Sequence, residues 1–103
     1  GANRNVPLAP GTGDEGWLAA VSTLADWARG ARALVVALGV DAAGGDPESP
    51  LTVTPAGFRA AGRVLGELGL PTVLVQEGGY DLDSIGGLVL ETLTGFEQAA
   101  RSG

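Results

Sequence analysis

Two short, continuous apolar runs constrain the fold of this chain more than any other feature of its sequence. They are Leu34–Leu38, which reads LVVAL, and Thr72–Val75, which reads TVLV. Both are rich in β-branched residues and lack the polar positions of a surface helix, so we predict two strands buried on both faces. A helical segment separates them, and strand–helix–strand at this spacing is typical of a parallel pair.

Two helices around the first run are marked by their end signals. The first is predicted to begin at about Asp14, because acidic residues favour the first turn of a helix, and to stop at Gly30. The second begins at Thr54-Pro55, with Thr54 as the N-cap and Pro55 at the first helical position, and ends at Gly69. Its expected buried stripe is Phe58, Ala61, Leu65 and Leu68.

A third helix is predicted to start at about Asp83 or Ser84 and to fray over residues 98–103. We expect one of its faces to be buried, made of Ile85, Leu88, Val89, Leu93 and Phe96. Four further side chains are expected to have structural roles only. Packing is expected for Trp17 and Trp27, and a solvated helix face for Arg59 and Arg63.

The order helix, strand, helix, strand, helix leaves the predicted sheet incomplete. A parallel strand buried on both faces needs neighbours on both edges, and most sheets contain more than two strands. The chain has 103 residues, which is enough for one small domain and too few for two. We therefore interpret it as part of a larger α/β domain. It is either a piece of a longer polypeptide or a chain that completes its sheet with another one.

Composition excludes several classes of protein. The chain has no cysteine and no histidine, so it holds no disulfide framework, no thiol catalysis, no Ser-His-Asp triad and no Cys- or His-rich metal site of its own. A net charge of −6 argues against binding to nucleic acid. No apolar run approaches the ~20 residues of a membrane span, and no signal peptide is visible. We expect a soluble, cytoplasmic protein of bacterial type.

Polar, glycine-rich turns follow both predicted strands. Asp41 lies at the first exit and Tyr80 at the second, where Gly78 and Gly79 precede it. Because ligands bind beyond the carboxyl ends of parallel strands, these side chains are candidates for a site. A carboxylate can ligate a divalent metal, and a phenol can donate a hydrogen bond to an oxyanion. The same residues are also typical of plain turns, and the residues alone leave both interpretations open.

Two nucleotide-binding alternatives have little support. Gly11-Thr12-Gly13 lies at a helix start like a phosphate loop, but the lysine and the other glycines of that motif are missing. A receiver-like α/β domain would have the same order of elements. It would also need a glycine-rich phosphate loop after its first strand, which this sequence lacks.

Three groups of residues follow one another along the chain. They are Asn5-Val6-Pro7-Leu8 with Gly11-Thr12-Gly13-Asp14, Leu38-Gly39-Val40-Asp41 with Asp46-Pro47, and Glu77-Gly78-Gly79-Tyr80. In this order and at this spacing they resemble the C-terminal third of the zinc-dependent histone deacetylase superfamily. The Leu-Gly-Val-Asp motif and the run from Leu51 to Phe58 resemble the sequences of its bacterial acetylpolyamine amidohydrolase branch. The resemblance extends from about Asn3 to Phe96.

The resemblance implies a fold and a domain organisation. The fold is α/β, part of a three-layer α/β/α arginase–deacetylase fold with a mainly parallel sheet, to which this chain supplies about two strands and three helices. Residues 1–103 would be the C-terminal part of a single deacetylase-like domain whose N-terminal part is absent.

The resemblance also implies roles for four residues. Asp41 matches the last of three zinc ligands, and Tyr80 matches the residue that polarises the scissile amide carbonyl together with zinc. Gly78 and Gly79 match the backbone lining the substrate pocket. The family's other two ligands, an Asp and a His, and its general-base His pair would lie upstream. Many relatives carry His where this chain has Ala43, which favours the amidohydrolase branch. One ligand is too few for a catalytic zinc site, so the isolated chain is expected neither to hold zinc tightly nor to catalyse.

The implied function is that of a segment of a zinc-dependent deacetylase that hydrolyses acetyl-amide bonds of acetylpolyamines or of acetyl-lysine. The expected cofactor is zinc, and the expected partners are a small acetylated amine or acetyl-lysine, without nucleic acid or membrane. A non-enzymatic alternative is a catalytically incomplete deacetylase-like module with a structural or interaction role. Such a module could form a homo-oligomer, or pair with a complementing chain, through exposed strand edges.

Overall fold

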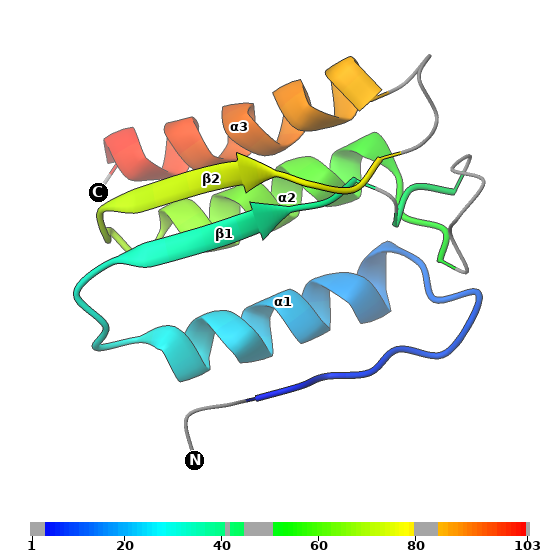
Figure 1. Ribbon diagram of the computed structural model, residues 1–103, viewed down its shortest axis with the longest axis horizontal. Helices are drawn as coiled ribbons and strands as arrows, with labels where there is room; N and C mark the ends of the chain where they lie inside the picture. Colours follow the sequence, from blue (N-terminus) through cyan, green and yellow to red (C-terminus); the bar gives the residue numbers. More distant parts are fainter. Residues whose placement is uncertain (1–3, 41, 45–50, 80–84, 103) are drawn as a thin grey trace.

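The computed structural model describes residues 4–40, 42–44, 51–79 and 85–102. In these residues the order of elements is helix, strand, helix, strand, helix, as the sequence predicts (Figure 1). The elements are α1 (Asp14–Ala28), β1 (Leu34–Leu38), α2 (Pro55–Gly66), β2 (Thr72–Gln76) and α3 (Ile85–Ser102).

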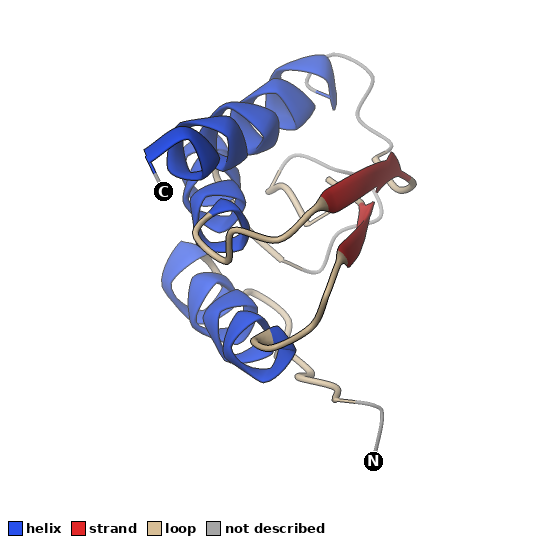
Figure 2. Cartoon of the chain, turned by 90° about the vertical axis from the view of Figure 1, so that its left-hand side faces the viewer, coloured by secondary structure: helices blue, strands red, loops and turns tan. Residues whose placement is uncertain are grey.

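Strands β1 and β2 form a parallel pair, in register from Leu34 opposite Thr72 to Leu38 opposite Gln76. Helix α2 makes the crossover between them, which confirms the predicted parallel unit. Figure 2 shows the helices gathered on one side of the sheet, so the described residues form two layers. Of the predicted α/β/α arrangement, this chain therefore displays the sheet and one helical layer.

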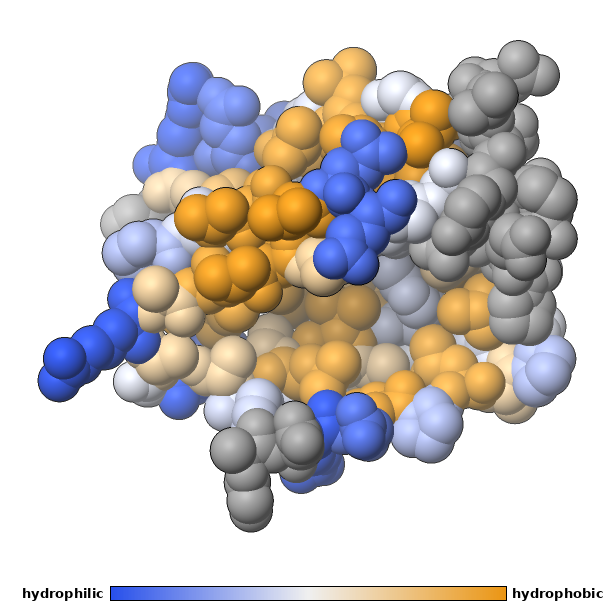
Figure 3. Space-filling view, viewed as in Figure 1, coloured by the Kyte–Doolittle hydropathy of each residue, from blue (hydrophilic) through white to orange (hydrophobic). Residues whose placement is uncertain are grey.

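The other face of the sheet is bare. Val35 is 73% exposed, Val73 58% and Val75 47%. Apolar side chains gather over the two strands on this face in Figure 3. The prediction of burial on both faces is therefore wrong within the described ranges, because no described helix lies on this side of the sheet. The alternating residues that face the helices, such as Val36, contribute to the core.

The core lies between the helices and the strand exits. Phe58 of α2 and Val40, just beyond β1, are its largest fully buried side chains. The ring of Trp17 meets that of Phe58 edge-on, with centroids 4.9 Å apart and an interplanar angle of 61°. This contact attaches α1 to α2 and confirms the packing role of Trp17.

Trp27 does not share that role, because it is 49% exposed. It borders an apolar groove of about 410 Å³ between α1, β1 and α2. Helix α1 packs against α2 and leaves the groove open beside β1, so the expected packing partner of Trp27 is missing from the described chain.

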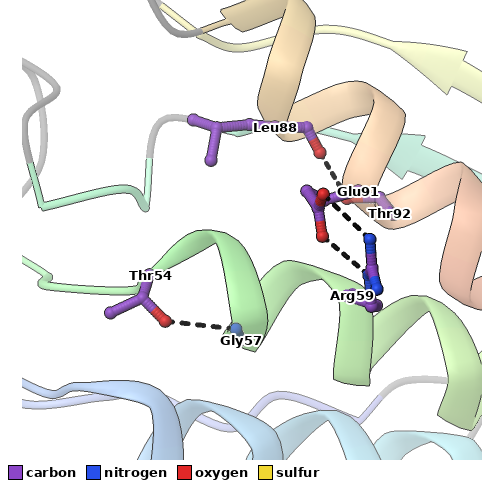
Figure 4. Close-up of polar contacts among 6 residues, drawn as sticks. All are labelled: Thr54, Gly57, Arg59, Leu88, Glu91 and Thr92. Carbon is purple, nitrogen blue, oxygen red and sulfur yellow. Dashed lines mark hydrogen bonds and ion pairs between the residues drawn. The ribbon is translucent and has the colours of Figure 1, made fainter.

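Helix α2 begins as predicted. Thr54 is its N-cap, and its Oγ1 accepts a hydrogen bond from the Gly57 N–H over 3.2 Å (Figure 4). Pro55, which has no N–H to satisfy, occupies the first turn. The helix ends at Gly66, three residues before the predicted stop, and Gly69 adopts a φ of +67° in the turn that follows.

Helices α2 and α3 approach each other backbone to backbone. A Cβ at Gly62 of α2 would overlap the carbonyl oxygen of Thr92, and one at Gly95 of α3 would overlap that of Arg59. Beside this contact, the guanidinium of Arg59 donates two hydrogen bonds to the carboxylate of Glu91, over 2.7 and 3.1 Å (Figure 4). Arg59 keeps 43% of its side chain exposed and Arg63 is exposed, so both lie on the predicted solvated face, where Arg59 is also paired with Glu91.

The buried face of α3 agrees with the predicted one at Leu88, Ile85 and Val89 and differs from it at Leu93. Leu88 and Thr92 are buried together with Gly95, while Leu93 is 39% exposed. The Thr92 hydroxyl donates to the carbonyl of Leu88 over 3.0 Å, so its burial leaves no polar atom unpaired. The helix also continues to Ser102, where fraying was expected. Its predicted start, at Asp83 or Ser84, lies outside the described residues.

Among the described residues, no helix has both the length and the apolar character needed to cross a membrane. The cytoplasmic location expected from the sequence stays a prediction.

Candidate functional site

The carboxyl ends of β1 and β2 continue side by side beyond the sheet. The N–H of Glu77 donates to the carbonyl of Leu38 over 2.7 Å, and the N–H of Val40 donates to the carbonyl of Gly78 over 2.9 Å. The two exits are therefore joined as far as Val40, one residue before Asp41, and Gly78, two residues before Tyr80. Asp41 and Tyr80 themselves lie outside the described residues.

A third segment joins these exits. Residues 42–44 run beside residues 51–53, with a parallel bridge between Ala43 and Val53. The N–H of Val53 donates to the carbonyl of Ala42 over 3.1 Å, and the N–H of Gly44 donates to the carbonyl of Val53 over 3.2 Å. Ala43 and Val53 are both buried, so this bridge belongs to the core as well as to the exit.

A fourth segment comes from the start of α1. The N–H of Thr52 donates to the carbonyl of Thr12 over 2.9 Å. Asp14, the first residue of α1, accepts from the N–H of Thr54 with its Oδ1 over 2.7 Å, and from the hydroxyl of Thr54 with its Oδ2. We call residues 11–14, 40, 42–44, 51–54 and 77–79 the strand-exit rim. It unites four segments that are far apart in the sequence.

Gly78 and Gly79, the predicted pocket residues, belong to this rim and are partly buried. Gly79 has a φ of +142°, a backbone angle that residues with a side chain rarely adopt. A Cβ there would lie 2.8 Å from Cγ2 of Val40 and 2.8 Å from Cδ1 of Ile85. Both the backbone conformation and the surrounding space therefore require glycine at this position.

We expect the Gly79→Ala substitution to lower activity by disturbing the chain just before Tyr80. A non-glycine residue in a sparsely populated backbone region costs about 1–3 kcal/mol, and the displaced chain would shift Tyr80, to which the resemblance assigns a role on the substrate. The measurement is kcat with an acetylated amine, the substrate class that the resemblance implies, together with the thermal midpoint, in the intact gene product that carries this chain. Gly69→Ala is the control, because Gly69 also has a positive φ but an added Cβ there would meet nothing within 4 Å. Equal losses of kcat in the two variants would contradict this expectation.

The rim cannot hold a metal ion with its described side chains alone. Within the described ranges, no three His, Cys, Asp or Glu side chains come together. Asp14 uses both carboxylate oxygens on Thr54. The whole chain lacks His and Cys, so carboxylates are the only common zinc ligands it contains. A catalytic zinc site needs three protein ligands, and the chain fits such a site only as the source of a carboxylate ligand.

Sequence reasoning missed two features of the rim. It assigned Asp14 only to the first turn of α1, and it gave residues 51–53 no structural role. The signal for Asp14 is its place in the Gly11-Thr12-Gly13-Asp14 motif, but its partner Thr54 is 40 residues away. That pairing becomes visible only once the two helix starts are placed side by side.

The fold and the motifs around the rim define a family. The chain matches the family described as histone deacetylase domain over residues 1–96. The match spans most of the chain, and the chain therefore belongs to the histone deacetylase family. The resemblance noted from the sequence motifs is confirmed.

Particular relatives are acetylpolyamine amidohydrolases. The chain is 39% identical over 105 residues to acetylpolyamine amidohydrolase 1 of Pseudomonas aeruginosa, a match covering 98% of this chain and 30% of that protein. It is 37% identical over 97 residues to the acetylpolyamine amidohydrolase of Mycoplana ramosa, covering 92% of this chain and 28% of that protein. The chain thus spans less than a third of the length of these relatives.

A solved structure supports the same assignment. The crystal structure of acetylpolyamine aminohydrolase from Burkholderia pseudomallei superposes with a TM-score of 0.90 at 35% identity, covering 94% of this chain and 29% of that one. The structure of the HDA15 HD domain gives a TM-score of 0.73 at 30% identity. These neighbours confirm the α/β deacetylase fold. The roles of Asp41, Tyr80, Gly78 and Gly79 stay predictions.

Proposed function

We propose that the intact gene product carrying this chain is a zinc-dependent deacetylase that hydrolyses the acetyl-amide bond of acetylated polyamines. The observation that carries the proposal is the joining of the two strand exits, where Val40 bonds Gly78 one residue before Asp41 and two before Tyr80. In a histone deacetylase family member, two joined strand exits that lead into Asp41 and Tyr80 support the proposal that these residues serve one site.

Asp41 is proposed as one zinc ligand, with the remaining ligands outside this chain. The residue types in the chain support this proposal. A carboxylate is a normal zinc ligand, and the chain has no His or Cys with which to complete the site. When bound, zinc would act as a Lewis acid on the amide oxygen and would lower the pKa of a bound water to about 7.

Tyr80 is proposed to donate its phenolic hydrogen to the amide oxygen as negative charge develops there. A fixed donor of this kind stabilises the transition state more than the ground state, because the hydrogen bond strengthens with the charge. Gly78 and Gly79 carry no side chain, which lets the main chain approach the acetyl group closely. The φ of +142° at Gly79 supports this proposal, because it is a main-chain path that glycine follows readily and other residues rarely do.

Acetylated polyamines are proposed before acetyl-lysine because relatives named acetylpolyamine amidohydrolase match nearly the whole chain. Histone deacetylase 15 of Arabidopsis thaliana is 43% identical, but over 53 residues that cover 50% of this chain and 10% of that protein. A small acetylated amine is therefore the first substrate to test.

The test is acetate release by the intact gene product from an N-acetylated diamine, beside an acetyl-lysine peptide of matched concentration. We expect faster release from the diamine, loss of activity after treatment with a chelator, and recovery on addition of zinc. No release from either substrate by a zinc-loaded protein would favour the alternative, a catalytically incomplete module with a structural role. Faster release from the peptide would overturn the substrate assignment alone.

A further inference from the structure

Both chain neighbours of Asp41 are anchored by main-chain hydrogen bonds. On the side before it, the carbonyl of Val40 accepts from the N–H of Ala43 over 3.2 Å. On the side after it, the carbonyl of Ala42 accepts from the N–H of Val53. The second anchor depends on the position of residues 51–53. These residues lie outside β1 and β2, so the sheet does not fix them and their position depends on their hydrogen bonds to neighbouring segments.

Asp14 is one of the groups that hold this anchoring segment, beside the hydrogen bond from the Thr52 N–H to the Thr12 carbonyl. Its two carboxylate oxygens take both polar hydrogens that Thr54 offers, one from the main chain and one from the hydroxyl. The Thr54 hydroxyl oxygen at the same time accepts from the Gly57 N–H, so the cap of α2 and the start of α1 share one network. Thr54 directly follows Val53, so fixing Thr54 also fixes Val53.

A second observation shows that the space for this carboxylate is built into the fold. A Cβ at Gly57 would lie 2.7 Å from Cγ of Asp14 and 2.9 Å from Cγ1 of Val53. Gly57 is buried and lies in the first turn of α2. Glycine therefore leaves the room that Asp14 occupies beside Val53.

We propose that Asp14 is a positioning residue for Asp41, acting through Thr54, Val53 and Ala42. It touches neither metal nor substrate, and the inference rests on the proposed function of Asp41 as a zinc ligand. Metal affinity depends on how well a ligand is pre-oriented, and loss of an outer-shell partner typically costs 10–100-fold in affinity. An Asp14 that served only to join two helices would affect stability without changing the affinity of the folded protein for zinc.

The experiment compares Asp14→Ala with Asp26→Ala in the intact gene product. Asp26 is a matched control, because it lies on the same helix and its carboxylate accepts from the exposed Arg29 over 3.0 Å, remote from the rim. Two readouts are taken on folded protein. They are the zinc Kd, from competition with a fluorescent chelator, and the rate of amide hydrogen exchange in peptides that contain residues 42–44 and 51–54.

We expect Asp14→Ala to raise the zinc Kd by up to about 10-fold, the lower end of the range for a direct partner because Asp14 acts through intervening residues, and to accelerate exchange in residues 42–44 and 51–54, while Asp26→Ala changes neither. Asp14→Asn keeps an acceptor for the Thr54 N–H, so it should restore most of the affinity. If Asp14→Ala fails to fold, Thr54→Val takes its place, with Thr54→Ser as its conservative partner.

The outcomes separate the inference from the function on which it rests. A wild-type protein that binds no zinc would overturn the proposed function, and with it the role given to Asp14. A wild-type protein that binds zinc, beside a folded Asp14→Ala variant with the same Kd and the same exchange rates, would overturn the inference and leave the proposed function standing.

Discussion

Replacing Tyr80 by phenylalanine in the intact gene product is expected to lower kcat for deacetylation about 10²- to 10³-fold, the usual cost of removing one oxyanion donor. The substitution removes one hydroxyl and keeps the ring, so the change is confined to the hydrogen-bonding group. Because the hydrogen bond is proposed to strengthen only as charge develops, kcat should fall much more than KM changes.

The measurement is steady-state acetate release, with zinc content and the thermal midpoint recorded for both proteins. Zinc content should be unchanged, because Tyr80 is proposed to act on the substrate and not as a ligand. Turnover equal to that of the wild type would refute the role given to Tyr80. A parallel loss of zinc would show instead that the residue acts through the metal site.

The second large effect is expected at the contact between α2 and α3. We expect Gly95→Ala to destabilise the intact gene product by about 3 kcal/mol, because overpacking typically costs 1–3 kcal/mol and here the obstacle is main chain. The added Cβ would overlap the carbonyl oxygen of Arg59 and lie 3.1 Å from the N–H nitrogen of Arg63. Neither atom can move without displacing α2.

The control for Gly95→Ala is Gly87→Ala in the same helix. A Cβ added at Gly87 would meet nothing within 4 Å, so the change should be neutral or stabilising by up to about 1 kcal/mol. The measurement is the midpoint of thermal or urea unfolding. Similar midpoints for the two variants would mean that the helices are not in backbone contact in solution.

The strands and the starts of two helices follow from local patterns in the sequence. The run of residues 34–38 forms β1 with the predicted boundaries, and Thr54-Pro55 caps α2 as predicted. These features are visible locally because apolar runs and caps depend on neighbours within a few residues. Which residues at the strand exits carry chemistry is left open by the local patterns, and the resemblance to a family supplied only a prediction.

The errors arise where burial depends on a partner from elsewhere. Leu93 was expected in the core by its apolar character, but the contact with α2 is centred on Gly95, whose lack of a side chain gives no hydrophobic signal. The pattern of β1 predicts burial on both faces, yet Val35 is 73% exposed because no described helix lies on that side of the sheet. Long-range pairs such as Asp14 with Thr54 leave no periodic signal at all.

The strand-exit rim also bears on how such a protein can change over evolutionary time. Its segments are joined largely through main-chain N–H and carbonyl groups, which any residue except proline supplies. Exposed positions such as Glu77 and Gly44 can therefore be exchanged while these hydrogen bonds persist, whereas Gly79 is fixed by its backbone conformation. The surface around the strand exits can thus vary by single substitutions while the main chain that forms them keeps its position.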